Sequence, residues 1–201
     1  MKYFYSIKND RCFKTKIKRS VFICSLRHVK NVLKAKEFIS EITSEHKQAT
    51  HNCWAYIVGE KGDVRHCSDH GEPPGTAGKP MLNALETYDM TNIAAVVTRY
   101  FGGVKLGIRG LIDAYNDTVK KTIEMDKLIK FVKTARYQIE VPYIFNDTLI
   151  HHLKKFHGKI ADTTYTDIVT HIFEVEEQES SEFAALLNGY QNSGKLKYMI
   201  L

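Results

Sequence analysis

The chain has 201 residues, 43% of them hydrophobic and 26% charged, with a net charge of +6. This length allows one or two domains, and the composition excludes a disordered or fibrous chain. No apolar run approaches the ~20 residues that span a bilayer, and the first residues contain no apolar core of signal-peptide length. We therefore expect a cytoplasmic, soluble protein without a membrane partner.

Charge is distributed unevenly along the chain. Residues 1–134 contain 23 Lys and Arg against 14 Asp and Glu, whereas residues 135–201 contain 6 against 9, so the balances are +9 and −3. This asymmetry predicts two domains, 1–134 and 135–201, of which the first is basic. Nucleic acid is the first candidate partner for a basic domain, and a solvated basic surface is the alternative.

The first domain is predicted to mix strands and helices. Apolar and β-branched runs predict four strands, at 14–25, 52–58, 64–68 and 93–98. Apolar residues spaced three and four apart predict three helices, at 30–47, from about Pro80, and from about residue 107. The third helix carries a stripe that we expect to face the core: Ile108, Leu111, Ile112, Tyr115, Val119 and Ile123.

The second domain is simpler to interpret. Alternating apolar residues predict a strand over 137–143, and a helix follows that contains Leu149, Leu153 and Phe156 and ends at Gly158. The remaining elements are two strands, a helix and a last strand, at 160–166, 168–176, 183–190 and 196–200. The order β-α-β-β-α-β is that of a ferredoxin-like unit.

Two glycine-bearing loops, at 69–80 and 99–110, each precede a predicted helix. Glycine lets the backbone approach a ligand closely, and free N–H groups at a helix start favour anions. The residues expected to contact an anion or nucleic acid are Lys79, Arg99, Gly102, Gly103, Lys105, Gly107 and Arg109. Tight packing of two strand-to-helix turns is the alternative, because neither loop has P-loop or dinucleotide-binding spacing.

Side chains that could carry chemistry gather near the first loop. Cysteines and histidines at 51–70 could form a metal site or a thiolate pair. Neighbouring residues of a strand face opposite sides, which weakens the case for a metal site. No metal or cofactor is therefore predicted. The four cysteines include no CxxC pair, which favours reduced thiols. The candidates for a pocket are His51, Asp69, Glu72 and Thr76. Four aromatic residues could stack on bases or belong to the core: Trp54, Tyr56, Tyr100 and Phe101.

Three ordered strings, ATHNCWAYIVG (49–59), SDHGEPPGTAGKPML (68–82) and VVTRYFGGVKLGIRGLIDAY (96–115), resemble the signature of the IMPACT family, bacterial YigZ type. The resemblance implies an α+β protein. Its first domain would be an α/β sandwich similar to domain 2 of ribosomal protein S5, and its second a ferredoxin-like domain similar to domain V of elongation factor G. For bacterial members it suggests RNA or ribosome binding, without an established reaction. Three positions depart from the family pattern: His70 replaces an Asp, Arg109 a Gly, and Asp113 an Arg.

Three functional hypotheses follow. The first is a nucleic-acid- or ribosome-binding regulator of translation, whose phosphate contacts come from the glycine loops and from the basic segment 14–19. The second is an enzyme acting on a small phosphorylated or peptide substrate between the loops. The third is an interaction module that binds a protein partner through the acidic second domain. The residues favour a binding protein over an enzyme.

Overall fold

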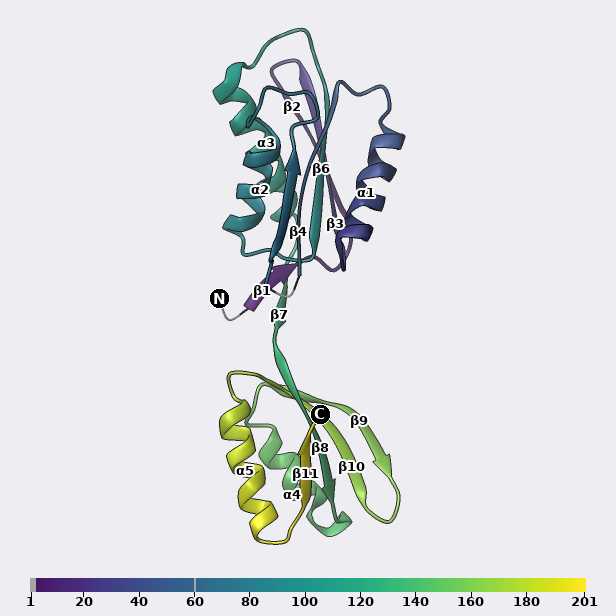
Figure 1. Cartoon of the computed structure of the whole chain (residues 1–201), viewed down its shortest axis with the longest axis vertical. Helices are drawn as coiled ribbons and strands as arrows, with labels where there is room; N and C mark the ends of the chain where they lie inside the picture. The colour runs from purple at the N-terminus through teal and green to yellow at the C-terminus, as the bar shows by residue number, and fades with distance from the viewer. Residues whose placement is uncertain (1–2, 60) are drawn as a thin grey trace. The chain divides into compact units, whose positions relative to one another are not determined.

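The computed structural model describes residues 3–59 and 61–201 (Figure 1). The chain divides into two compact units, Tyr3–Phe131 and Val132–Leu201. The domain boundary expected at 134/135 stays a prediction. The fold class is α+β, as predicted, because strands and helices are mixed in both units.

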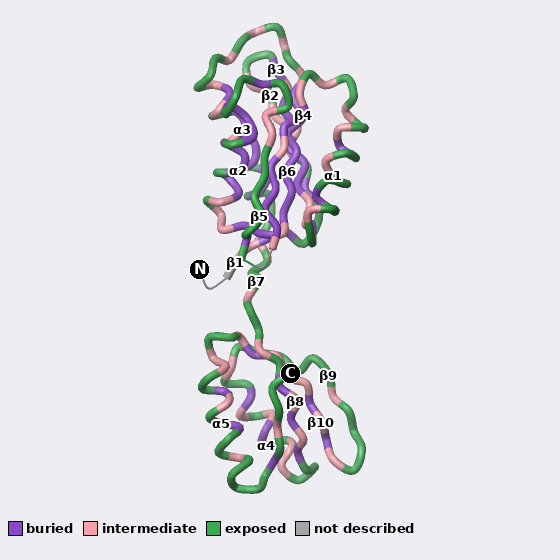
Figure 2. Tube along the Cα trace, viewed as in Figure 1, coloured by how far each residue is buried: buried purple, intermediate pink, exposed green. Residues whose placement is uncertain are grey.

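The first unit is built on a five-stranded antiparallel sheet in the order β2-β3-β6-β4-β5. Its strands are β2 (Arg11–Ile17), β3 (Ser20–His28), β4 (His51–Val58), β5 (Val64–Ser68) and β6 (Ile93–Tyr100). The central strand β6 is buried along its length up to Tyr100, as its continuous apolar run predicted (Figure 2). A separate two-stranded sheet joins β1 (Tyr3–Ser6) to β7 (Ile129–Val132).

Three helices cover the two faces of this sheet. Helix α1 (Val32–Glu45) packs on one face, where Phe38 and Ile42 join a cluster with Tyr56 and Val96. Helices α2 (Gly78–Thr87) and α3 (Gly107–Ile123) pack side by side on the other face and enclose the larger core (Figure 1). The unit is therefore a three-layer sandwich in which both loops that precede α2 and α3 carry the chain to the same face.

Two details of the prediction for the first unit are wrong. The predicted strand at 14–25 is two strands, β2 and β3, joined by a turn in which Lys18 has a φ of 51°. The face that holds odd-numbered residues in β2 holds even-numbered residues in β3, and the prediction of one continuous strand missed this change at the turn. Ile108, expected in the core, is 67% exposed because it lies in the first turn of α3, whereas Leu111, Tyr115, Val119 and Ile123 are buried.

The second unit is a four-stranded antiparallel sheet in the order β11-β8-β10-β9 with two helices. Its elements are β8 (Thr134–Val141), α4 (Tyr143–Leu153), β9 (Gly158–Tyr165), β10 (Val169–Glu176), α5 (Ser180–Asn192) and β11 (Lys197–Ile200). This order confirms the ferredoxin-like pattern. Tyr143 begins α4 instead of ending β8, because Pro142 is the N-cap of that helix.

The core of the second unit lies between one face of its sheet and the two helices. Tyr137, Ile139 and Phe173 from the sheet pack there with Leu149 and Phe183 from the helices. Within the described residues, no helix is long and apolar enough to cross a membrane.

Candidate functional site

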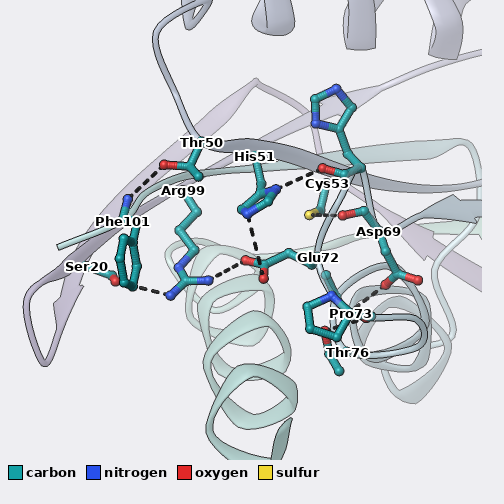
Figure 3. A network of polar contacts seen from close by, with 12 residues as sticks. Ser20, Thr50, His51, Cys53, Asp69, Glu72, Pro73, Thr76, Arg99 and Phe101 are labelled. Atoms are coloured by element: carbon teal, nitrogen blue, oxygen red, sulfur yellow. Dashed lines mark hydrogen bonds and ion pairs between the residues drawn. The ribbon is translucent and has the colours of Figure 1, made fainter. Parts of the chain in front are cut away.

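Strand register brings the predicted site residues to one end of the first unit. His51 is paired with Arg99 across β4 and β6, and Val21 with Tyr100 across β3 and β6. The loops 69–77 and 101–106 and the turn between β2 and β3 therefore lie together. We call this region the loop end; Figure 3 shows its polar contacts.

A buried ion pair lies beneath the loops. Arg99 Nη1 donates to Glu72 Oε1 at 2.6 Å, and the two side chains are only 5% and 3% exposed. The Tyr115 hydroxyl donates to the same Glu72 oxygen at 2.8 Å, and Arg99 Nη2 contacts Ser20 Oγ at 3.3 Å. Arg99 was expected to contact an anion or nucleic acid. Glu72 neutralises the positive charge of Arg99 inside the protein. Little of that charge is therefore available to attract a phosphate from outside.

The rings of two phenylalanines flank the Arg99 guanidinium. Its carbon lies 5.4 Å from the centroid of Phe22 and 5.4 Å from that of Phe101. Arg99 Nε is the buried side-chain nitrogen that has no hydrogen-bond partner within the described residues. The ion pair and the rings thus hold the guanidinium from several sides.

One cysteine, Cys53, is buried within this network. Cys53 Sγ donates to the carbonyl oxygen of Asp69 at 2.9 Å and contacts the Tyr115 hydroxyl at 3.3 Å. Burial raises the pKa of the Cys53 thiol to about 12, and the thiolate is the reactive form. Burial likewise raises the pKa of Tyr115. Both groups serve as neutral hydrogen-bonding partners.

Asp69 organises the first loop. Its carboxylate accepts backbone N–H groups from Gly75, Ala77 and Gly78 at 2.8–2.9 Å. Burial opposes ionisation, but these three donors outweigh it and hold the pKa of Asp69 below its ordinary value. Thr76 is also engaged locally, because its hydroxyl donates to the Pro73 carbonyl at 2.7 Å. The two residues shape the loop that precedes α2.

His51 and Glu72 are the predicted pocket residues that do face each other. His51 Nε2 lies 3.9 Å from Glu72 Oε2, and His51 Nδ1 lies 2.9 Å from the carbonyl oxygen of His70 (Figure 3). His70 has a φ of 41°, and its own Nδ1 accepts the backbone N–H of Asn52. The four pocket candidates therefore separate into a facing pair and two loop-forming residues.

The glycines of the second loop, and Gly107 at the start of α3, are required for different reasons. A Cβ on Gly102 would lie 1.8 Å from the carbonyl oxygen of Arg19, so only glycine allows the loop to pack against the β2–β3 turn. Gly103 and Gly107 have φ values of +82° and +78° and open space around them. Packing explains Gly102, whereas backbone conformation explains the other two.

The predicted cations of the loop end are exposed, apart from Arg99. Lys79 lies in the first turn of α2, and Lys105 lies in the second loop. Neither makes an ion pair within the part of the chain that the structure describes. Arg109 is 88% exposed and pairs with Asp113 one helical turn later, at 3.3 Å. Asp113 therefore partly compensates the charge that Arg109 adds.

Among the four aromatic candidates for base stacking, exposure favours one. Tyr56 is 3% exposed, whereas Phe101 is 45% exposed and lies at the loop end. Trp54 stacks on Tyr56, and Tyr100 contacts His46. Across residues 3–59 and 61–201, no group of three or more His, Cys, Asp or Glu side chains could hold a metal ion.

Sequence reasoning missed two members of the polar network. Tyr115 was assigned to the core from its spacing, and Ser20 was treated as part of a strand. Each does lie in the core, but their hydroxyl groups contact Glu72 and Arg99. A phenol on an otherwise apolar helix stripe is the signal that could have indicated a buried polar partner.

Residues 18–123 match the family described as the Impact N-terminal domain. The chain belongs to the IMPACT family. Residues 147–188 match a second family, a domain of unknown function (DUF1949), which lies within the second unit.

Relatives of similar length support the IMPACT assignment across the chain. The chain is 34% identical to IMPACT family member YvyE of Bacillus subtilis, over 98% of this chain and 93% of that protein. It is 33% identical to IMPACT family member YigZ of Escherichia coli, over 92% and 91%. A crystal structure described as a hypothetical protein covers all of this chain and 98% of its own, with 31% identity and a TM-score of 0.64. These matches confirm the family that the three sequence strings indicated.

Proposed function

We propose that this IMPACT family protein binds RNA, free or within the ribosome, through the loop end of its first unit, and that it regulates translation in this way. Family membership and the basic first unit support the proposal. The observation that carries it is the charge balance of the loop end, where the acidic groups are already engaged and several cations are not.

The acidic side chains of this region are occupied by partners inside the protein. Glu72 is paired with Arg99, Asp69 accepts three backbone N–H groups, and Asp113 pairs with Arg109. Because each of these negative charges is already balanced by a partner, the three side chains should repel an approaching phosphate only weakly.

Several exposed cations of the same region, unlike Arg109, make no ion pair within the described residues. Lys16, Lys18 and Arg19 lie at the β2–β3 turn, and Gly102 packs directly against the backbone of Arg19. Lys105 extends this group on the second loop, and within the described residues none of the four makes an ion pair. Clustered exposed cations of this kind bind nucleic-acid phosphates and release counterions.

The test is binding of a fluorescent single-stranded RNA, and of ribosomes, across a salt series. The variant carries Lys18→Gln, Arg19→Gln and Lys105→Gln. Losing three phosphate contacts should lower the salt slope by about 2 and weaken binding roughly ten- to a hundredfold near 0.1 M salt.

A matched control carries the same charge change away from the loop end: Lys30→Gln, Lys36→Gln and Lys121→Gln. These lysines are also exposed and make no ion pair within the described residues. The control should bind RNA nearly as wild type does. Equal loss in both triple variants would show that net charge, and not the loop end, governs binding. Salt-independent binding by wild type would contradict the proposal.

A further inference from the structure

We propose that the ring of Phe101 is a stacking platform for an unpaired base, so that the loop end binds single-stranded RNA in preference to a duplex. This inference rests on the proposed function, because it specifies which form of RNA the loop end takes. It is drawn from the contacts that hold the ring in place and from the cations beside it.

The backbone that carries the ring is fixed at the surface of the loop end. Phe101 is 45% exposed. Its N–H donates to Thr50 Oγ1 at 3.1 Å, and the next N–H along the chain, that of Gly102, donates to Ser20 Oγ at 3.3 Å (Figure 3). These two bonds tie the start of the second loop to the segments that begin β4 and β3. The point from which the ring projects is therefore fixed before any ligand arrives.

One side of the ring rests on the buried ion pair. The guanidinium carbon of Arg99 lies over the Phe101 ring, 5.4 Å from its centroid. Arg99 is held in turn by Glu72, whose Oε1 lies 2.6 Å from Nη1, so the support of the ring is itself fixed. The exposed part of the ring is apolar surface that gains free energy when it is covered. A planar ring held in this way offers one surface on which one base can stack.

The cations beside the ring can hold the phosphates of the same strand. Gly102, the residue after Phe101, packs against the carbonyl oxygen of Arg19 in the β2–β3 turn. Lys105 follows on the same loop as the ring, and Lys18 lies next to Arg19. All three cations are exposed, and none makes an ion pair with another described residue. An aromatic ring beside phosphate-binding cations is the arrangement by which proteins bind single strands.

Stacking on this ring distinguishes a single strand from a duplex. In an A-form duplex the bases are paired and stacked on one another, so a side chain at the surface reaches no base face. Cations alone do not give this preference, because a duplex carries its phosphates at a higher density than a single strand does. Tighter binding of the single strand therefore reports contact with bases.

The test compares an RNA that forms no internal pairs with the duplex of the same length, by fluorescence polarisation on wild-type protein near 0.1 M salt. The single strand should bind at least about fivefold more tightly, as expected for one stacked base. Equal affinity, or tighter binding of the duplex, would overturn the inference and leave the proposed function standing. If wild type binds neither RNA, the proposed function fails and this inference fails with it.

A first variant assigns the preference to the ring. Phe101→Leu keeps an apolar side chain without the ring, so single-strand affinity should fall to about the level of the duplex and duplex affinity should stay unchanged. Phe131→Leu is the matched control, because Phe131 is 38% exposed and stacks on His28, at the end of β3 opposite to the loop end. The control should bind both RNAs as wild type does. A Phe101→Leu protein that keeps the preference for single strands would remove Phe101 from the site.

A second variant separates stacking from a structural function of the ring. Phe101→Trp keeps an aromatic ring at the same position and should retain the preference for single strands. The fluorescence of the introduced indole should fall when single-stranded RNA binds, because a base stacked on an indole quenches it, and it should change little with the duplex. Wild type gives the background signal, because its one tryptophan is Trp54, which stacks on Tyr56. Indole emission that single-stranded RNA leaves at this background level would overturn the inference.

Discussion

The two glycine loops at the loop end differ in where their polar groups point. The loop 69–77 turns its polar groups inward: the Asp69 carboxylate binds two backbone N–H groups of its own loop and that of Gly78 at the start of α2, and Glu72 is buried. The loop 101–106 binds its neighbours through the N–H groups of Phe101 and Gly102, while Lys105 remains exposed. The first loop therefore fixes the structure of the loop end, and the second presents groups to a partner.

This difference predicts where substitutions should act. A change in the first loop or its buried partners should alter mainly the free energy of unfolding. A change at an exposed position of the second loop should alter mainly binding. The exception is the part of the second loop that contacts the rest of the unit, such as Gly102. A substitution there should alter the free energy of unfolding, so these residues test the comparison most directly.

The largest effect is expected from breaking the ion pair beneath the first loop. Arg99→Leu leaves Glu72 buried without its cation, which should cost about 3–5 kcal/mol of unfolding free energy. Urea denaturation at neutral pH measures this loss. The double variant Arg99→Leu with Glu72→Gln removes both charges and should recover much of it. If Arg99→Leu lowers the free energy of unfolding by less than about 1 kcal/mol, the pair behaves as an exposed one and this account is wrong.

The next effect separates two adjacent glycines of the second loop. Gly102→Ala places a Cβ 1.8 Å from the Arg19 carbonyl oxygen, so the turn must move, and we expect a loss of about 3 kcal/mol. Gly103→Ala meets nothing within 4 Å and incurs only the left-handed strain of its +82° φ, about 1 kcal/mol. Thermal denaturation of the two variants checks the ranking. Equal losses would show that Gly102 is not a packing residue.

A smaller, pH-dependent effect is expected at Asp69. Asp69→Asn weakens three backbone hydrogen bonds and should cost about 1–2 kcal/mol at neutral pH. Because the folded state lowers the pKa of this carboxyl, its contribution is present above the ordinary value of about 4 and is lost as pH falls through the folded-state pKa. The stability difference between wild type and Asp69→Asn should therefore narrow in acid. A difference that is constant from neutral pH to about pH 3 would contradict this account.

The elements that periodicity predicted well are those whose pattern of burial is regular. The buried run of β6 and the alternating residues of β8 are typical of central strands, and the structure confirms both. The β2–β3 turn was missed because Lys18 and Arg19 form it without the Gly or Asn that usually marks a two-residue turn.

The sequence predicted several residues of the candidate site but not how their side chains pair. The sequence indicated Glu72 and Arg99 separately, as a pocket residue and an anion contact, and their mutual neutralisation depends on the packing of the first loop against β6. That pairing arises only when the chain folds. The departure at His70 also has a physical explanation, because its Nδ1 accepts the Asn52 N–H, which a carboxylate can also do.

The smallest effect is expected at the start of α3, where two further departures from the family pattern compensate each other. Arg109 and Asp113 are an exposed pair one helical turn apart, and such pairs contribute about 0.3–0.5 kcal/mol. Replacing both, as Arg109→Gln with Asp113→Asn, should change stability by no more than about 0.5 kcal/mol. It should also change RNA affinity less than Lys105→Gln alone, because the pair adds little net charge to the loop end. Fluorescence polarisation at low salt makes this comparison. If the double variant loses more affinity than Lys105→Gln, then Arg109 contacts RNA directly, and the surface that the second loop presents extends onto α3.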